Sequence, residues 1–277
     1  MNALVRKLTR AARRRLVPPT VPLAALDAVD MPRKIENGRC IYEGYQRGTP
    51  LKYGRLADAI WNDPVYRKAR AAGLRAPVRT MITEERMMNL FLIVKFFLRG
   101  LASRNVIEFG TYRGGGAIFL AMLLREFYPE ARVYALDTFE GMPAVEKGLD
   151  LPPPDDFAAT NLAVIDRTVK ALGLTNIEFV KGLIEDTASG VYARAGAIGL
   201  AHIDVVLHSA VVYVQNSVWD VMTPGGYVVY DDAIEPTCPG AMQAVEELVR
   251  SKHASAEQVW PQMVFRAHLG AASHQVH

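Results

Sequence analysis

Residues 105–127, NVIEFGTYRGGGAIFLAMLLREF, contain an apolar run, a glycine-rich turn and a helical apolar pattern in direct succession. The run 105–110 predicts a buried strand that ends at Gly110, and residues 117–127 predict a helix. Free backbone N–H groups at such a helix start favour an anionic group, such as the carboxylate of an amino-acid-bearing ligand. A purely structural tight turn explains the same glycines equally well.

The same alternation of strand and helix continues along the chain. Helices are expected at about 160–172, 211–222 and 239–251. Near-continuous apolar strands between helices indicate a parallel sheet that is covered on both faces, so we expect an α/β, Rossmann-like fold. The further strands that this pattern predicts are RVYALD (132–137), NIEFVKG (176–182), HIDVVLH (202–208), YVVYDD (227–232) and VFRAHLG (264–270).

The N-terminal third of the chain predicts helices and a linker. Apolar spacing predicts one helix over 51–72, interrupted at Asp63-Pro64, and another from Thr83 to Leu101. Residues 20–50 show no clear period and are interpreted as an irregular linker. We therefore divide the chain into a basic helix and linker (1–50), a helical segment (51–104) and the Rossmann-like domain (105–277).

Composition excludes several classes of protein. Half of the 277 residues are apolar, which is enough for a large core, and there is no apolar stretch of membrane-spanning length. Two cysteines cannot build a disulfide framework or a four-cysteine zinc site, so a reducing, cytoplasmic location is expected.

Positive charge is concentrated at the start of the chain. The first 15 residues hold six basic side chains and no acid, and the remainder has 26 basic against 29 acidic residues. A nucleic-acid-binding protein normally carries a basic face within its fold, so no nucleic-acid partner is expected. The basic segment predicts a solvated or partner-packed helix, with weak peripheral membrane contact as the alternative.

Acidic residues follow several of the predicted strands, where ligands of open α/β sheets bind. Asp137 ends the second strand, about 27 residues after Gly110, and an acid at that position can accept hydrogen bonds from both hydroxyls of a ribose. A loop cap is the alternative role. Because the GxGxxG spacing of dinucleotide-binding proteins is missing, an adenosine-containing ligand without a diphosphate, such as S-adenosylmethionine, fits better than NAD.

Three further acids, Asp204, Asp231 and Asp232, lie at the ends of neighbouring predicted strands. Clustered carboxylates repel one another unless a cation or a proton lies among them, and oxygen-only ligands suit Mg²⁺. A hydroxyl beside such an ion becomes more acidic, and one carboxylate can then accept its proton. Helix capping or salt bridges are the alternative roles of these acids.

Six blocks of sequence, taken in order and with their spacing, resemble the macrocin O-methyltransferase (TylF) family, the Mg²⁺-dependent sugar O-methyltransferases of antibiotic pathways. The similarity covers roughly residues 51–250. The blocks are RTMITEERMMNL (79–90), VIEFGTYRGGGAIF (106–119), ALDTFEGMP (135–143), FVKGLIEDT (179–187), PGGYVVYDD (224–232) and CPGAMQAVEE (238–247).

The resemblance implies a seven-stranded methyltransferase sheet, a hydroxyl acceptor on a small molecule or glycan, and a homo-oligomer. It also implies that the helical segment 51–104 covers the substrate. It implies that Asp204, Asp231 and Asp232 hold the metal and that Asp204 is the general base. Asp137 would hold the ribose beside Thr138 and Phe139, and Lys181-Gly182 would lie near the adenine. The residues that it places around the methionine part of S-adenosylmethionine are Glu108, Gly110, Thr111, Arg113 and Gly114.

The chain departs from the family pattern after the fourth predicted strand. The family has approximately Asp-Gly-Asp-Leu/Met-Tyr-Glu-Ser, and this chain has DVVLHSA at 204–210. The second acid is replaced by Val206 and the tyrosine by His208. His208 could serve as a second base, since imidazole titrates near neutral pH, and a packed histidine is the alternative.

The sequence therefore supports one leading hypothesis and two others. The leading one is an S-adenosylmethionine-dependent O-methyltransferase in which Asp204, or alternatively His208, removes the proton of an acceptor hydroxyl. The second is a degenerate, non-catalytic relative that binds S-adenosylmethionine or a partner. The third, a nicotinamide oxidoreductase, is disfavoured by the missing GxGxxG.

Overall fold

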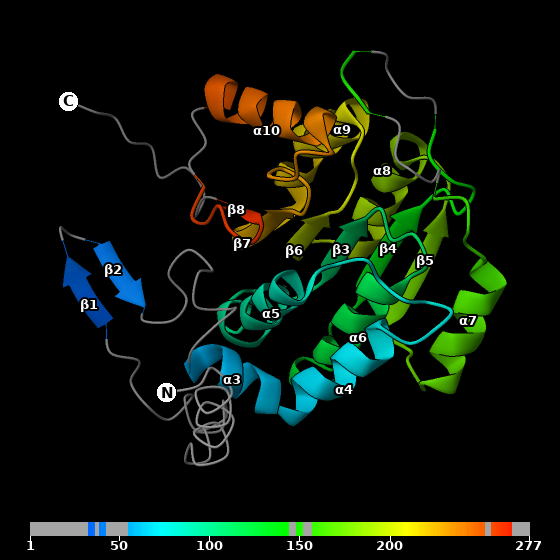
Figure 1. The fold of residues 1–277 in the computed structure, drawn as a ribbon, viewed down its shortest axis with the longest axis horizontal. Helices are drawn as coiled ribbons and strands as arrows, with labels where there is room; N and C mark the ends of the chain where they lie inside the picture. Colours follow the sequence, from blue (N-terminus) through cyan, green and yellow to red (C-terminus); the bar gives the residue numbers. More distant parts are fainter. Residues whose placement is uncertain are drawn as a thin grey trace, which may run out of the picture.

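Six strands form the central sheet, in the order β5-β4-β3-β6-β7-β8 (Figure 1). The computed structural model describes residues 33–36, 39–42, 55–143, 148–151, 157–252 and 256–267. All neighbouring strands of this sheet are parallel except β7 and β8, which are antiparallel. The strands are β3 (Val106–Phe109), β4 (Val133–Asp137), β5 (Ile177–Lys181), β6 (Ile198–Ile203), β7 (Met222–Tyr230) and β8 (Met263–Arg266).

The α/β, Rossmann-like fold is thus confirmed, with six strands in the described residues where seven were expected. The stretch before β8 forms a single antiparallel bridge, between Gln258 and Val264, and no strand. Pro261 lies in this stretch, and a proline has no N–H to donate to a ladder of hydrogen bonds.

The fourth strand was misplaced by the sequence pattern. Residues 202–208 were expected to form it, but β6 ends at Ile203 and helix α9 begins at His208. Ile203 pairs with Phe109, the last residue of β3, so the chain beyond Ile203 has no strand beside it on that side. The apolar residues 205–207 line a cavity instead of extending the sheet.

Helices cover both faces of the sheet (Figure 1). One face carries α3 (Arg55–Asn62), α4 (Pro64–Gly73), α5 (Glu84–Leu92) with a π-helical turn (Ile93–Phe97), α6 (Gly115–Phe127) and α7 (Leu162–Ala171). The other face carries α8 (Ile184–Ala195), α9 (His208–Ser217), a 3-10 turn (Val218–Val221) and α10 (Pro239–Lys252).

The predicted interruption at Asp63-Pro64 is confirmed, because Asp63 accepts hydrogen bonds from the backbone N–H groups of Val65 and Tyr66 and thereby begins α4.

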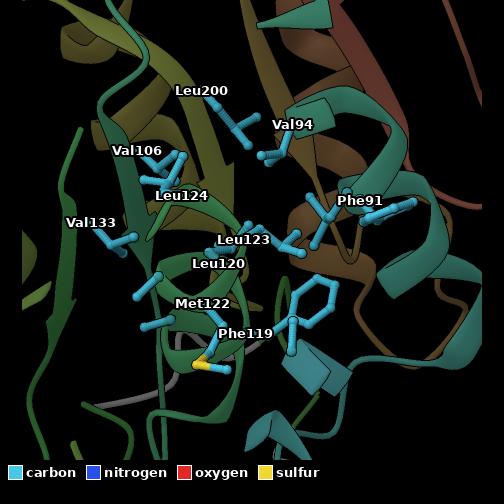
Figure 2. Close-up of a cluster of buried hydrophobic side chains, with 14 of the residues drawn as sticks. Phe91, Val94, Val106, Phe119, Leu120, Met122, Leu123, Leu124, Val133 and Leu200 are labelled. Atoms are coloured by element: carbon cyan, nitrogen blue, oxygen red, sulfur yellow. The ribbon is translucent and has the colours of Figure 1, made fainter. Parts of the chain in front are cut away.

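The N-terminal helices share their core with the sheet. Phe91 of α5 and Val94 of the π-helical turn pack into the same buried cluster as Phe119 and Leu123 of α6 and Leu200 of β6 (Figure 2). Burial of large apolar side chains at this junction joins residues 55–101 to the Rossmann-like part of the chain. The loop that follows α4 is thereby held against the carboxyl ends of the strands.

A two-stranded antiparallel hairpin, β1 (Arg33–Glu36) with β2 (Arg39–Tyr42), lies within the stretch that was interpreted as an irregular linker. That interpretation is wrong for these eight residues. The dipeptide Asn37-Gly38 between the strands often marks a β-hairpin. The residues on either side do not alternate clearly between apolar and polar, so the sequence pattern did not predict these strands. The expected basic helix at the start of the chain lies outside the described residues. No helix in the described part of the chain is long and apolar enough to cross a membrane.

Candidate active site

A cavity of about 780 Å³ opens at the carboxyl ends of the parallel strands. Its walls come from the carboxyl ends of β3 to β7, the segment between α4 and α5, the loops after β4 and β7, and the first turns of α8 and α9. The strand ends contribute the carboxylates of Glu108, Asp137, Asp204, Asp231 and Asp232, and Glu185 and Glu235 also line the cavity.

The loop between β3 and α6 forms one wall and is held by Asp137. One carboxylate oxygen of Asp137 accepts hydrogen bonds from the backbone N–H groups of Thr111 (2.9 Å) and Tyr112 (2.8 Å), and the other accepts from Phe139 N–H (2.8 Å). Gly110 has φ +82°, and a Cβ there would lie 2.0 Å from the carbonyl oxygen of Asp204. Only glycine therefore lets this loop pass so close to the end of β6.

Two polar atoms on this wall have no hydrogen-bond partner among the described residues. They are Oε2 of Glu108 and Oγ1 of Thr111, and both are buried. Buried polar atoms are nearly always satisfied in native proteins, so these two suit a bound ligand with a cationic or hydroxyl group. Gly116 leaves the space for Glu108, because a Cβ at that position would lie 2.5 Å from Oε1 of Glu108.

Asp204, Asp231 and Asp232 form a compact carboxylate cluster, as the sequence predicted. One oxygen from each lies within 4.8 Å of the others. Burial, together with the charge of Asp231, raises the pKa of Asp204 well above its usual value and that of Asp232 to about 7. Such crowding of acids in a cavity is relieved by a cation, so the donor set fits the Mg²⁺ that was expected.

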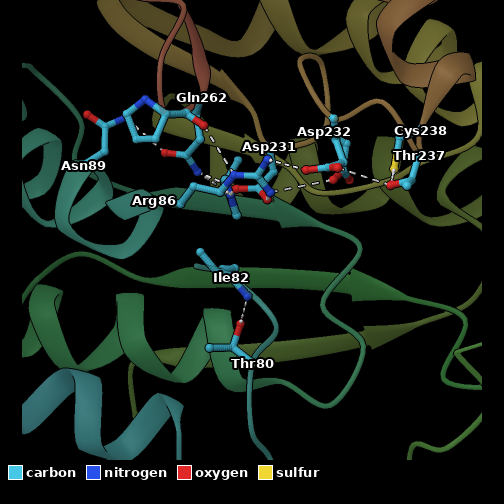
Figure 3. Close-up of polar contacts among 12 residues, drawn as sticks. Thr80, Ile82, Arg86, Asn89, Asp231, Asp232, Thr237, Cys238 and Gln262 are labelled. Atoms are coloured by element: carbon cyan, nitrogen blue, oxygen red, sulfur yellow. Dashed lines mark hydrogen bonds and ion pairs between the residues drawn. The ribbon is translucent and has the colours of Figure 1, made fainter. Parts of the chain in front are cut away.

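Arg86 of α5 also lies at this cluster, although the sequence reasoning did not single it out (Figure 3). Its Nη1 is 2.7 Å from Oδ2 of Asp231 and 3.9 Å from Oδ1 of Asp232, and its Nη2 is 3.5 Å from Glu235. Burial opposes the charged form of Arg86, but these carboxylates raise its pKa overall. Only tertiary packing brings α5 to the end of β7, so the local spacing of residues contains no direct signal for this contact.

The other oxygen of Asp231 is held from within the protein. Oδ1 of Asp231 accepts a hydrogen bond from Gln262 and contacts Nε2 of His202 at 3.3 Å. Gln262 is in turn bonded to Asn89 of α5 (Figure 3). Burial would raise the pKa of Asp231, but the contacts with His202 and Arg86 outweigh burial and lower that pKa below its usual value.

Comparison with known proteins agrees with this geometry. Residues 52–260 match the family model described as macrocin-O-methyltransferase (TylF), which covers most of the chain. The chain belongs to the macrocin O-methyltransferase (TylF) family. It is accordingly an S-adenosylmethionine-dependent O-methyltransferase.

Three curated relatives are O-methyltransferases that are named for glycosylated or related natural products. An 8-demethyl-8-(2,3-dimethoxy-alpha-L-rhamnosyl)-tetracenomycin-C 4'-O-methyltransferase of Streptomyces olivaceus is 28% identical over 59% of this chain and 66% of its own length. A mycinamicin III 3''-O-methyltransferase of Micromonospora griseorubida is 27% identical over 74% of this chain and 84% of its own. A demethyldecarbamoylnovobiocin O-methyltransferase of Streptomyces niveus is 24% identical over 74% and 85%.

Solved structures show the same fold. The O-methyltransferase NovP superposes with a TM-score of 0.58 and 22% identity, over 77% of this chain and 95% of that one. The calicheamicin methyltransferase CalS11 gives a TM-score of 0.56, again with 22% identity, over 76% and 90% of the two chains. At this identity the likeness concerns the fold alone.

The structure places the predicted site residues in two groups. The first group lines the cavity, and its members are Glu108, Gly110, Thr111, Asp137, Thr138, Gly182, Asp204, Asp231 and Asp232. The second group does not line it in the described part of the chain, and its members are Arg113, Gly114, Phe139, Lys181 and His208.

Each member of the second group has another contact. Arg113 donates to the carbonyl oxygen of Ala159 (2.8 Å), and Lys181 pairs with Glu140. Nε2 of His208 lies 3.2 Å from Glu247 of α10. Gly114 has φ +82° at the start of α6, and the ring of Phe139 packs against Phe179. The roles that the resemblance implies for these residues stay predictions.

Proposed function

We propose that this enzyme transfers a methyl group from S-adenosylmethionine to a hydroxyl of a glycosylated small molecule, with Mg²⁺ held by Asp204, Asp231 and Asp232. One observation carries the proposal. A single cavity contains both the unpartnered buried oxygen of Glu108 and the three strand-end carboxylates. A cofactor site and a cation site would thus be adjacent, as methyl transfer between two bound reactants requires.

The wall formed by Glu108, Gly110 and Thr111 is the proposed place for the methionine part of the cofactor. Oε2 of Glu108 would accept from its ammonium group, and Oγ1 of Thr111 would bond a further polar atom. Asp137 and Gly182 would lie along the adenosine part. Because Asp137 already fixes the loop through three backbone N–H groups, it would serve both the loop and the ribose.

Asp204 is the proposed base. It lies in the same cavity as the proposed cofactor wall, and its raised pKa favours acceptance of a proton from an acceptor hydroxyl. A magnesium ion bound to the cluster would supply positive charge that makes such a hydroxyl more acidic. His208 remains the alternative base, although its ring contacts Glu247.

The acceptor is proposed to carry an apolar body. Met81, Leu151 and Leu183 are large apolar residues that line the cavity and still expose 68%, 55% and 42% of their surface. Val205 and Val206 continue this apolar wall, and Val206 stands where the family has an acid. The curated relatives are named for rhamnosylated tetracenomycin, mycinamicin and novobiocin compounds, which supports a glycosylated natural product as the acceptor class.

A cytoplasmic location, homo-oligomer formation and weak membrane contact of the basic N-terminal segment stay predictions from the sequence.

The test is calorimetric titration with S-adenosylhomocysteine, with and without Mg²⁺, and with Mg²⁺ alone. The proposal expects cofactor binding and a separate Mg²⁺ signal that Asp231→Asn removes. The exposed Asp166 supplies a matched control, since Asp166→Asn should leave both signals unchanged. Absence of cofactor binding would refute the proposal.

One observation favours a second candidate, a relative that binds S-adenosylmethionine without metal or without turnover. Both carboxylate oxygens of Asp231 already have protein partners, with Arg86 on one and Gln262 and His202 on the other. The altered segment 204–210 agrees with this candidate. Cofactor binding with no Mg²⁺ signal and no methyl transfer to any glycoside would establish it.

A further inference from the structure

His202 of β6 lies between the two halves of the site and is fully buried. The parallel register places it beside Glu108 of β3 on one side and beside Val229 of β7 on the other. Asp231 lies two residues beyond Val229, just after the end of β7. The register of the strands therefore places the imidazole ring of His202 between Glu108 of the proposed cofactor wall and Asp231 of the carboxylate cluster.

Both ring nitrogens of His202 contact carboxylates. Nδ1 lies 3.1 Å from Oε1 of Glu108, and Nε2 lies 3.3 Å from Oδ1 of Asp231. A carboxylate oxygen accepts hydrogen bonds, and each ring nitrogen of His202 faces one such acceptor at hydrogen-bond distance. One side chain therefore contacts two carboxylates of the site at once.

The two carboxylates depend on His202 to different degrees. The carboxylate of Glu108 makes a single hydrogen bond within the described part of the chain, to His202, and its other oxygen has no partner there. Asp231 has further support from Arg86 and Gln262. The orientation of Glu108 thus rests mainly on the ring, whereas Asp231 is held from three sides.

We propose that His202 is a positioning residue that orients Glu108 toward the cofactor and Asp231 toward the metal. This inference rests on the proposed function. His202 touches neither reactant in this scheme and acts through the two carboxylates, as residues that support metal ligands commonly do. Its Nδ1 faces the cofactor half of the site, and its Nε2 faces the metal half.

Two substitutions separate these two halves. The amide nitrogen of asparagine can take the place of Nδ1, and that of glutamine can take the place of Nε2. His202→Asn should therefore keep the bond to Glu108 and lose the one to Asp231, and His202→Gln should do the reverse. Both variants replace the imidazole with a neutral amide, so a difference between them reports on the position of the donor.

The experiment measures the affinity for S-adenosylhomocysteine without metal and for Mn²⁺ without cofactor, by calorimetry and by electron paramagnetic resonance. His202→Gln should weaken cofactor binding by about tenfold or more and leave Mn²⁺ binding within about threefold; His202→Asn should weaken Mn²⁺ binding by about tenfold and leave cofactor binding within about threefold. Gln215→Met is the matched control, because Gln215 is buried and bonded to the Ala244 carbonyl outside the cavity.

The outcomes are distinct. Equal losses of both ligands in both variants, or no loss in either, would overturn the role of His202 while leaving the proposed function in place. A wild-type protein that binds neither ligand would overturn the proposed function and this inference with it. Selective losses in the expected directions would support both.

A measurement on the wild-type protein covers the case in which the variants do not fold. Nitrogen-15 spectra of histidine-labelled protein should show one ring whose nitrogen-bound hydrogen exchanges slowly with solvent, since His202 is fully buried. S-adenosylhomocysteine should shift its Nδ1 signal, and Mg²⁺ should shift its Nε2 signal. No shift at either nitrogen on saturation with both ligands would overturn the proposal.

Discussion

Single residues hold the loops of this site in place, and Asp137 shows this most clearly. The sequence suggests ribose binding or a loop cap as alternatives, and the structure shows that the carboxylate bonds three backbone N–H groups of the surrounding loops. Asp231 is similar, because its charge is balanced by Arg86 and His202 before any metal is considered. Substitution of single residues can therefore distinguish the chemical role of a side chain from its role in holding the site in place.

Asp204→Asn should reduce methyl transfer by at least about 10²-fold, which is the usual contribution of a general base. The amide keeps the shape of the side chain but cannot accept the proton, so the dissociation constant for S-adenosylhomocysteine should stay within about threefold. Rates measured at saturating cofactor, alongside calorimetry, check both expectations. Full activity in this variant would contradict the assignment of Asp204.

Arg86→Gln should lower the melting temperature and make the protein more responsive to Mg²⁺. Removal of one partner from a buried ion pair costs roughly 3–5 kcal/mol, because the other charge stays buried. Mg²⁺ would replace the lost positive charge near Asp231 and Asp232, so it should raise the melting temperature more in the variant than in the wild type. Thermal unfolding with and without MgCl₂ measures this.

Arg250→Gln is the control for that prediction, since Arg250 is 80% exposed and pairs only with Glu246 among the described contacts. It should change neither the melting temperature nor the effect of Mg²⁺. An equal Mg²⁺ response in Arg86→Gln and the wild type would argue against a cation site at the cluster.

At the scale of elements, the junction between β3 and β6 decides the shape of the site. The loop after β3 passes so close to the end of β6 that Gly110 meets the backbone of Asp204. α5 closes the opposite side, because its apolar face packs into the core shared with α6 while Arg86 points to the carboxylates. The site is thus assembled from element ends that packing brings together.

Gly110→Ala should weaken S-adenosylhomocysteine binding by more than about tenfold and lower the melting temperature. A Cβ at φ +82° costs roughly 1–2 kcal/mol in the backbone, and at 2.0 Å from the Asp204 carbonyl it must also displace the loop. Gly173→Ala is the matched control, since Gly173 also has positive φ (+64°) but nothing within 4 Å of the added atom. Equal effects of both substitutions on cofactor affinity would show that the contact with Asp204 is unimportant.

At the scale of the whole molecule, the N-terminal helices and the sheet share one buried cluster, so ligand binding at their junction should stabilise the described domain as a unit. S-adenosylhomocysteine at about 100 times its dissociation constant should add about 2.7 kcal/mol and raise the melting temperature by about 5–10 °C. Differential scanning calorimetry checks this, and Glu108→Gln should reduce the shift at the same concentration. A wild-type melting temperature that does not respond would argue against the cofactor site.

Much of the architecture followed from local patterns in the sequence. Apolar runs that alternate with helices predicted the doubly covered sheet, and Asp63-Pro64 predicted the boundary between α3 and α4, because an N-cap and a proline act within a few residues. The acids at the strand ends were predicted for a similar reason, since parallel strands all end at one edge. The predicted limits of the fourth strand were wrong, because an apolar run can either extend a sheet or line a cavity. Its composition is the same in both cases.

The sequence by itself determined the fold class, the family and the identity of the three clustered acids. Only the tertiary structure decided which other side chains meet them. Arg86 is 145 residues from Asp231 along the chain, and His202 is 94 residues from Glu108. Contacts at such separation depend on strand register and on how α5 packs against the sheet. Neither quantity is encoded in the local spacing of residues. The position of Arg86 beside the carboxylates, and that of His202 between Glu108 and Asp231, could therefore be found only in the folded molecule.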